Sequence, residues 1–283
     1  MTVIAVAQLA PVIGDPSANR SAAADAVGEA AAAGAQLIVL PELCDSGYVF
    51  DSAGEARGLA TEAGGSPTLR HWQELAAAHQ MVIVGGFCEL GDDGRLYNSA
   101  ALVDESGTRA VYRKAHLWDR EKLVFTPGEA PSPVVGLPFG RVAMAICYDL
   151  EFPEWARLPA LDGADLIAAP VNWPTMPRPA AERPAEVVKA QADAATGGVF
   201  VAIADRCGTE RGVDWIGGTV IIGPDGYPLA GPVMADRPAV LTADCVLARA
   251  RDKRINDHND LLADRRPELY WPVTSEKNAG NRG

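Results

Sequence analysis

Short apolar runs alternate along the first half of the chain with longer stretches rich in alanine and polar residues. The apolar runs have the length of strands, and the alanine-rich stretches are long enough for helices. Asp15 followed by Pro16 is typical of a helix start, and Gly34 suits the C-terminal cap of that helix. We therefore expect strands at 3–8, 37–40, 81–88, 99–103 and 109–112, and helices at 15–34 and 68–79.

The second half of the chain has the same style, although no sequence repeat occurs at a fixed period. Its expected strands are 142–146, 166–169, 199–204, 218–222 and 239–243, and its expected helices are 153–161 and 186–196. A proline-rich stretch at 170–184 is expected to be a loop. Alternating strands and helices with hairpin interruptions predict an α/β sandwich. Because residues from Asp264 onward are mostly polar, we divide the chain into one domain over 1–263 and a C-terminal tail over 264–283.

Composition narrows the class of protein. A hydrophobic fraction of 48% supports a sizeable core, and a formal net charge of −12 argues against a nucleic acid or an anionic membrane as partner. No apolar run approaches the roughly 18 residues of a membrane span, and the apolar N-terminus lacks the basic flank of a signal peptide. The five cysteines are scattered and include no Cys-x-x-Cys, which favours free thiols in a reducing cytoplasm over disulfides or structural zinc.

Candidate chemistry lies just past the apolar runs. Glu42, Lys114 and Cys147 each follow an expected strand, where α/β proteins place reactive groups. Pro153 starts a helix beyond Cys147, and the positive end of a helix favours a thiolate. Taken singly, Cys147 could be a buried structural cysteine, and the two charged residues could be solvated surface groups. His116 is a second possible base, but because Glu42 can do the same work, we expect His116 to be bonded in a loop beside the site.

The segments around these residues resemble the signatures of the nitrilase superfamily of carbon–nitrogen hydrolases. Leu-Pro-Glu ending at Glu42, Tyr-Arg-Lys-x-His-Leu around Lys114 and Ile-Cys-Tyr-Asp around Cys147 occur in the order and spacing of that family. The resemblance extends from about Val3 to the region of Asp244. It implies a four-layer α-β-β-α sandwich of two mixed sheets, so that 1–263 would be a carbon–nitrogen hydrolase domain, and it implies a homodimer or a higher homo-oligomer.

The resemblance also implies roles for individual residues. Cys147 would be the nucleophile, and Glu42 would take the thiol proton and later activate water. Lys114 and the backbone N–H of Tyr148 would stabilise the oxyanion. Glu121, which precedes Phe-Thr-Pro-Gly, would help to position these groups. Because this set supplies a base, an oxyanion donor and a nucleophile, we expect neither a metal ion nor an organic cofactor.

Four further residues are candidates for binding the substrate. Asn172 and Trp173 correspond to a segment that borders the pocket in the family, although Trp173 could equally be core, and Tyr48 could be a pocket wall or a packing residue. Glu151 stands where relatives that cleave the side-chain amides of dicarboxylic acids often have Arg. A carboxylate there would repel an anionic substrate, so neutral or cationic amides would be preferred. The alternative is that Glu151 forms a salt bridge and has no effect on specificity.

The residues at the nucleophile indicate the reaction. Cys147-Tyr148-Asp149 is similar to the amide-hydrolysing branches, whereas nitrile-cleaving members usually have Cys-Trp-Glu. We expect an amidase that releases ammonia from a small, uncharged aliphatic amide through a thioester on the cysteine. The enzyme alternative is an amidohydrolase of N-carbamoyl amines or amino acids. The non-enzyme alternative is an inactive scaffold of the same fold, against which the intact catalytic set argues.

Overall fold

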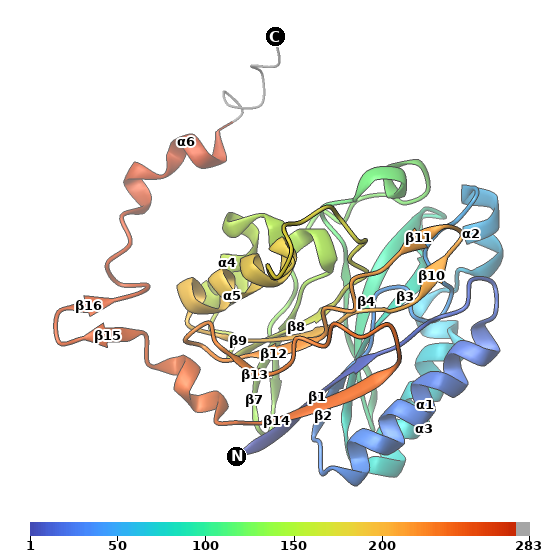
Figure 1. Ribbon diagram of the computed structural model, residues 1–283, viewed down its shortest axis with the longest axis horizontal. Coiled ribbons are helices and arrows are strands. Elements are labelled where there is room, and N and C mark those ends of the chain that lie inside the picture. The colour runs from blue at the N-terminus through green and yellow to red at the C-terminus, as the bar shows by residue number, and fades with distance from the viewer. Residues whose placement is uncertain (276–283) are drawn as a thin grey trace.

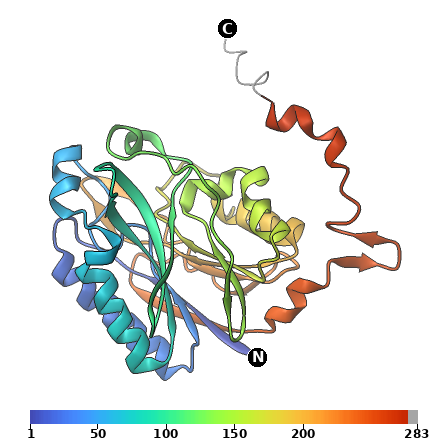
Figure 2. The ribbon, with the colours of Figure 1, turned by 180° about the vertical axis from the view of Figure 1, so that it is seen from behind.

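The computed structural model describes residues 1–275 (Figure 1). Two six-stranded sheets face each other, and helices cover both outer faces, so that the molecule has four layers (Figures 1 and 2). Both sheets mix parallel and antiparallel pairs. This confirms the predicted α-β-β-α sandwich.

The first sheet is built from the first half of the chain plus one late strand. Helices α1 (Pro16–Ala32) and α3 (Pro67–His79) cover its outer face (Figure 1). Its strand order is β14 (Ala239–Cys245), β1 (Thr2–Gln8), β2 (Leu37–Val39), β3 (Val82–Leu90), β4 (Leu96–Asp104) and β5 (Gly107–Arg113).

The second sheet has the same arrangement. Helices α4 (Pro153–Leu161) and α5 (Ala185–Gly197) cover its outer face (Figure 1). Its strand order is β6 (Val135–Leu137), β7 (Gly140–Met144), β8 (Leu166–Pro170), β9 (Phe200–Ala204), β12 (Val220–Ile222) and β13 (Pro228–Ala230). In both sheets three adjacent parallel strands are flanked by one antiparallel strand on one side and two on the other.

The core lies on both faces of each sheet. Along β1, Ile4 and Val6 pack into the cluster between the two sheets, whereas Ala5 and Ala7 pack toward the helices of the first sheet. The period-two alternation of side chains therefore buries every position of this strand segment. Such strands appear in the sequence as continuous apolar runs, which is why the run-based predictions locate them.

The helix starts follow their capping residues. The Asp15 side chain accepts a hydrogen bond from Ala18 N at 3.0 Å, and Ser66 caps α3 by accepting from Leu69 N at 3.3 Å. Several short elements were not predicted, among them helix α2 (Ala53–Leu59), the hairpin of β10 (Thr209–Glu210) and β11 (Val213–Asp214), and the edge strands β6 and β13.

The strand predicted to reach Ile146 ends at Met144, because the chain turns into a 3₁₀ helix, η3 (Cys147–Glu151). Two other short 3₁₀ helices are η1 (Ala63–Gly65) and η2 (Asp119–Leu123).

After β14 the chain leaves the body of the molecule (Figures 1 and 2). It forms η4 (Leu247–Arg251), the hairpin of β15 (Arg254–Asn256) and β16 (Asn259–Asp260), η5 (Pro267–Leu269) and α6 (Trp271–Thr274). We call residues 252–275 the C-terminal arm. The predicted domain boundary at 263 stays a prediction, and residues 276–283 of the predicted tail lie outside the described residues. No helix within residues 1–275 is both long and apolar enough to cross a membrane.

Candidate active site

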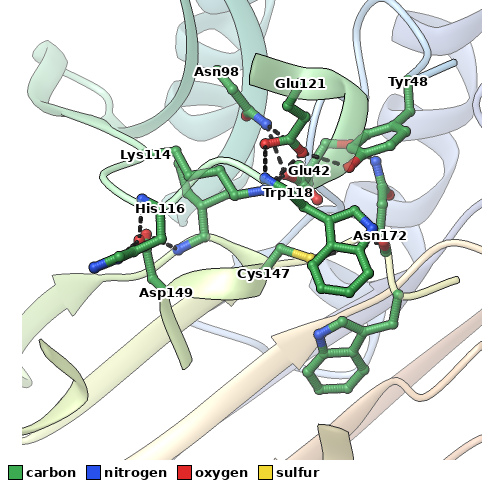
Figure 3. Close-up of polar contacts among 12 residues, drawn as sticks. Glu42, Tyr48, Asn98, Lys114, His116, Trp118, Glu121, Cys147, Asp149 and Asn172 are labelled. Atoms are coloured by element: carbon green, nitrogen blue, oxygen red, sulfur yellow. Dashed lines mark hydrogen bonds and ion pairs between the residues drawn. The ribbon is translucent and has the colours of Figure 1, made fainter. Parts of the chain in front are cut away.

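Segments from the two sheets converge on one buried point (Figure 3). Glu42 lies in the turn after β2, and Lys114 directly follows β5, so both come from the first sheet. Cys147 follows β7 of the second sheet. Glu42 and Lys114 are fully buried, and Cys147 is 4% exposed. The structure therefore brings together the three residues that the sequence singled out.

Lys114 bridges two carboxylates. Its Nζ donates to Glu42 Oε1 at 2.7 Å and to Glu121 Oε1 at 2.8 Å. Asn98 Nδ2 also donates to Glu42 Oε1, at 2.7 Å. The other oxygen, Glu42 Oε2, is buried and has no hydrogen-bond partner within the described part of the chain. One oxygen of Glu42 is thus held in place, and the second is available for proton transfer.

Burial controls the protonation of this group. It raises the pKa of Glu42 to about 7, while the Lys114 ammonium opposes the rise and the Glu121 carboxylate adds to it. Burial by itself lowers the pKa of Lys114, but the Glu121 and Glu42 carboxylates outweigh it and raise that pKa well above its ordinary value. Lys114 is therefore an ammonium, and Glu42 can exchange a proton near neutral pH.

The pKa of the Cys147 thiol differs from what the sequence predicts. Burial raises the pKa of the Cys147 thiol well above its ordinary value, Glu42 adds to the rise, and Lys114 opposes it. The helix α4 begins at Pro153 as predicted, but burial outweighs its positive end, so the expectation of a thiolate at Cys147 is wrong. A thiol with a raised pKa reacts only with the help of a base, and the Glu42 carboxylate is close enough to act on Cys147 electrostatically.

The backbone at Cys147 is strained. Its φ is 48°, in the left-handed region that non-glycine residues rarely adopt. Leu43, directly after Glu42, has a φ of 44°. Cys147 Sγ donates to the backbone oxygen of Asn172 at 3.7 Å. Strained residues at both catalytic turns are typical of sites where the surrounding structure fixes the direction of a reactive side chain.

Asp149 ties the nucleophile turn to the lysine segment. Its Oδ2 accepts from Tyr112 O–H at 2.6 Å and from Ile146 N at 3.1 Å. Its Oδ1 accepts from His116 N at 3.0 Å and lies 2.8 Å from His116 Nδ1. His116 is therefore bonded beside the site, as the favoured sequence interpretation holds. This fully buried carboxylate fixes residues on both sides of Lys114 against the residue before Cys147.

The predicted substrate-binding residues take different positions. Trp173 lines the same small cavity as Cys147 and also belongs to the core, and its role in substrate binding stays a prediction. Glu151 lines that cavity too, but its carboxylate is paired with Lys189, which partly cancels its charge. Asn172 is tied to the turn of Glu42, since its Nδ2 donates to the backbone oxygen of Glu42 at 2.8 Å. Tyr48 borders a neighbouring cavity.

Tyr48 is also tied to the catalytic set. Its O–H donates to Glu121 Oε1 at 2.5 Å, and burial raises its pKa well above the ordinary value, so the hydroxyl stays a donor. Glu121 Oε2 accepts from Trp118 N at 3.0 Å. Glu121 therefore holds Lys114 and Tyr48 in place and fixes the loop that carries Trp118.

Asn98 and Trp118 are among the residues that sequence reasoning missed as site residues. Asn98 bonds Glu42, and its only sequence signal is the family-like Tyr-Asn-Ser-Ala segment. Trp118 lines the Cys147 cavity (Figure 3), and its signal is its place between Lys114 and Glu121. In residues 1–275 no group of three or more His, Cys, Asp or Glu side chains could hold a metal ion.

Known proteins share this sequence and fold. Residues 3–255 match the family described as Carbon-nitrogen hydrolase. A protein named Nitrilase from Pyrococcus abyssi is 39% identical over 271 residues, which cover 96% of this chain and 100% of that protein. An N-carbamoylputrescine amidase from Arabidopsis thaliana is 33% identical, with 90% of each chain covered.

A solved structure agrees with these similarities. A mutant of the amidase from Nesterenkonia sp. AN1 superposes with a TM-score of 0.79 at 29% identity, covering 96% of this chain and 100% of that one. That structure shows the result of Michael addition of acrylamide at its active site cysteine. The chain therefore belongs to the carbon–nitrogen hydrolase family, within the nitrilase superfamily, and is a hydrolase that acts on carbon–nitrogen bonds.

Proposed function

We propose that the protein is an amidase that converts a small, uncharged aliphatic amide to its carboxylic acid and ammonia. The observation that carries this proposal is the buried Glu42 beside Lys114 and the Cys147 turn: one of its oxygens is tethered, and the other has no hydrogen-bond partner among residues 1–275. A thiol with a raised pKa can attack an amide only if a nearby base removes its proton, and Glu42 has a pKa suited to that task.

In the acylation half, Glu42 Oε2 takes the proton from Cys147 Sγ as the sulfur bonds to the amide carbon. The oxyanion that forms is stabilised by Lys114 Nζ and by the N–H of Tyr148. Lys114 has three N–H donors, two of which bond Glu42 and Glu121, so the third is left for the oxyanion. Tyr148 lies in the first turn of η3, where backbone N–H groups lack partners inside the helix.

The intermediate then collapses. Protonated Glu42 gives its proton to the leaving nitrogen, the carbon–nitrogen bond breaks, and ammonia leaves a thioester on Cys147. In the deacylation half, Glu42 takes a proton from water as the water oxygen attacks the thioester carbon. The carbon–sulfur bond breaks, the proton returns to sulfur, and the acid is released.

The charges around the Cys147 cavity support an uncharged substrate. Glu151 and Glu186 both line this cavity, and Lys189, paired with Glu151, balances one of the two carboxylates. A negative charge therefore remains beside the site, which disfavours a substrate carboxylate. Because Lys189 is paired with Glu151, Glu151 repels an anionic substrate less than the sequence alone suggests. The proposed preference against anions therefore rests on the summed charge of Glu151 and Glu186.

Hydrolysis of an N-carbamoyl amine is the second candidate. The N-carbamoylputrescine amidase from Arabidopsis thaliana favours it, because that relative covers 90% of this chain. The same catalytic residues would attack the carbamoyl carbon, and the products would include carbon dioxide as well as ammonia.

We further propose that the protein forms a homodimer or a higher homo-oligomer through the C-terminal arm. The arm projects from the body and exposes large apolar side chains, namely Ile255, Leu269, Tyr270 and Val273. Exposed apolar clusters of this kind mark protein–protein contacts. The occupant that we propose is a second copy of this chain.

Ammonia release from a matched panel tests the proposed reaction. The panel contains propionamide, propionitrile, N-carbamoylputrescine and succinamate, each with the wild type and with Cys147→Ala. We expect the wild type to release ammonia fastest from propionamide, with succinamate much slower. Carbon dioxide release with a higher kcat/KM for the carbamoyl compound would replace the amidase proposal by the second candidate, and release from propionitrile alone would overturn both.

A further inference from the structure

The cavity that contains Cys147 has room for little beyond the reacting group. Its volume is about 20 Å³. A single water molecule already needs roughly 10–15 Å³ by this kind of measure. The rest of a bound substrate must therefore lie outside this cavity.

A larger cavity lies next to it. Its volume is about 280 Å³, and it shares the lining residues Trp118, Pro174 and Met176 with the Cys147 cavity. Glu121 of the catalytic set also lines it. The shared residues place the two cavities side by side, so the larger space adjoins the position of a reacting carbon at Cys147.

The walls of the larger cavity are mostly carbon. Beyond the shared residues, the carbon-rich side chains of its lining include Tyr48, Phe50, Val124, Phe125, Val213 and Trp215. Two edge-to-face ring pairs stiffen these walls, with centroids 5.2 Å apart for Tyr48–Trp215 and 5.9 Å apart for Phe50–Phe125. The Tyr48 hydroxyl is already bonded to Glu121. The cavity thus offers mainly apolar surface to a ligand.

The charged residues of this cavity do not favour an ionic ligand. Glu121 lines it but is already paired with Lys114, and the exposed Asp119 and Arg120 have opposite charges that balance. A charged end group would gain no net attraction from this pair.

We infer that this larger cavity is the binding site for the hydrocarbon chain of the acyl group, and we call it the acyl cavity. The inference rests on the proposed amidase function: the nitrogen of a primary amide leaves as ammonia, so only the acyl part carries a chain. The occupant is an unbranched aliphatic chain or a phenyl ring. An apolar cavity of roughly 150 Å³ suffices for benzene in another protein, so about 280 Å³ accommodates a chain of several carbons.

The primary test is the chain-length dependence of kcat/KM over unbranched amides from acetamide to octanamide. Each methylene that enters apolar surroundings should raise kcat/KM by about fourfold until the cavity is full. Val213 lines the acyl cavity but not the Cys147 cavity, so Val213→Phe should lower the ratio of kcat/KM for hexanamide to that for propionamide. Val213→Leu, a smaller change, should move the optimum to a shorter chain.

Val188→Phe is the matched control, because Val188 is 51% exposed on α5 and lines neither cavity. It should keep the wild-type ratio. A flat chain-length profile in the wild type, or a wild-type ratio in both folded Val213 variants, would overturn the acyl cavity.

A binding measurement separates this inference from the proposed function. Calorimetry on Cys147→Ala should show hexanamide binding more than tenfold tighter than propionamide, from about fourfold per added methylene. Val213→Phe in the same background should remove the difference. If the wild type hydrolyses no amide, the amidase proposal fails while the calorimetry still reports on the cavity. If propionamide is hydrolysed but both amides bind equally, only the acyl cavity is wrong.

Discussion

The two sheets share one strand arrangement, yet they contribute different parts of the site. In the first sheet the turn after β2 carries Glu42, and the end of β5 carries Lys114. In the second sheet the turn after β8, the counterpart of β2, carries Asn172, while the strand β7, the counterpart of β1, leads to Cys147. In the proposed mechanism the first sheet supplies the charges and the second supplies the nucleophile. Equal topology therefore fixes where side chains can meet but not which chemistry they perform.

Removing the proposed nucleophile of the second sheet should have the largest effect on activity. Cys147→Ala should lower kcat by at least about 10⁴-fold, because no other group can form the thioester. Circular dichroism and thermal unfolding should show an intact fold. Cys245→Ala is the control, since Cys245 is equally a buried free thiol but lies at the end of β14, and it should keep its activity. Substantial turnover by Cys147→Ala would contradict the assignment.

Removing the base from the first sheet should have the next largest effect. Glu42→Gln should lower kcat/KM by about 10²–10⁴-fold, since general acid–base catalysis is lost in both halves of the reaction. In the wild type, kcat/KM should fall as the pH is lowered through about 7, where Glu42 becomes protonated. A wild-type profile that stays flat from pH 8 to pH 5 would be inconsistent with Glu42 as the base.

The same substitution should change the pH dependence of stability. The folded pKa of Glu42 is raised from 4.5 to about 7, so its contribution to stability is fully present below about 4.5 and is lost as the pH rises through about 7. The wild type should therefore lose about 3 kcal/mol of unfolding free energy relative to Glu42→Gln over that window. Urea unfolding at several pH values measures the difference, and a constant difference would argue against the raised pKa.

Removing the Lys114 cation should lower the rate slightly less than removing Glu42, but it should also reduce the free energy of unfolding. Lys114→Met should lower kcat by about 10²–10³-fold through the lost oxyanion donor. It leaves Glu42 and Glu121 buried without their cation, which should destabilise the protein by about 3–5 kcal/mol. Lys114 opposes the rise in the pKa of Glu42, so the acid limb of any residual activity should move above pH 7. An unchanged limb would show that the two groups are not coupled.

Asp149 links the two sheets, because it bonds Tyr112 of the first sheet and Ile146 beside Cys147, and we propose that it positions the nucleophile. Asp149→Asn should reduce kcat by about 10²-fold with little change in KM, because the turn before Cys147 loses its fixed geometry. The rate of Cys147 alkylation by acrylamide should fall in parallel, which a merely structural role would not produce. Asp165→Asn is the control: Asp165 is also a buried carboxylate, it bonds Arg141 and Arg251, and its loss should lower stability alone.

The C-terminal arm should have the smallest effect on the chemistry. Deleting residues 264–283 should lower the mass measured by light scattering, because part of the exposed apolar surface is proposed to contact a second copy. Ammonia release per active site should change little, since the described residues that line the Cys147 cavity all lie in the body. A monomeric wild type would contradict the proposed assembly.

The sequence predicted those elements whose contacts involve residues that are close together in the chain. Strands buried on both faces appear as apolar runs, and Asp15 with Pro16 marks a helix start through a contact made within one turn. The positions of Glu42, Lys114 and Cys147 followed from the same runs and from the family resemblance. The implied thiolate was wrong because burial, which depends on the opposite sheet, dominates the pKa of Cys147.

Contacts between residues that are far apart in the chain could not be predicted from local sequence patterns. The bond from Asn98 to Glu42 joins residues 56 positions apart, and the pairing of Glu151 with Lys189 joins residues 38 positions apart. Neither contact has a local signal in hydrophobic periodicity. The acyl cavity gathers residues from four separate segments, near 48, 120, 175 and 214, so only the folded chain reveals it.

The most direct test of the account is to map the residue that an electrophilic amide labels. Wild-type protein is incubated with acrylamide, with and without propionamide, and the adduct is located by peptide mass spectrometry. The account predicts an adduct on Cys147 that forms more slowly in the presence of propionamide and much more slowly in Glu42→Gln. An adduct on Cys44, Cys88, Cys207 or Cys245 with Cys147 unlabelled, or labelling of Cys147 that propionamide does not slow, would contradict it.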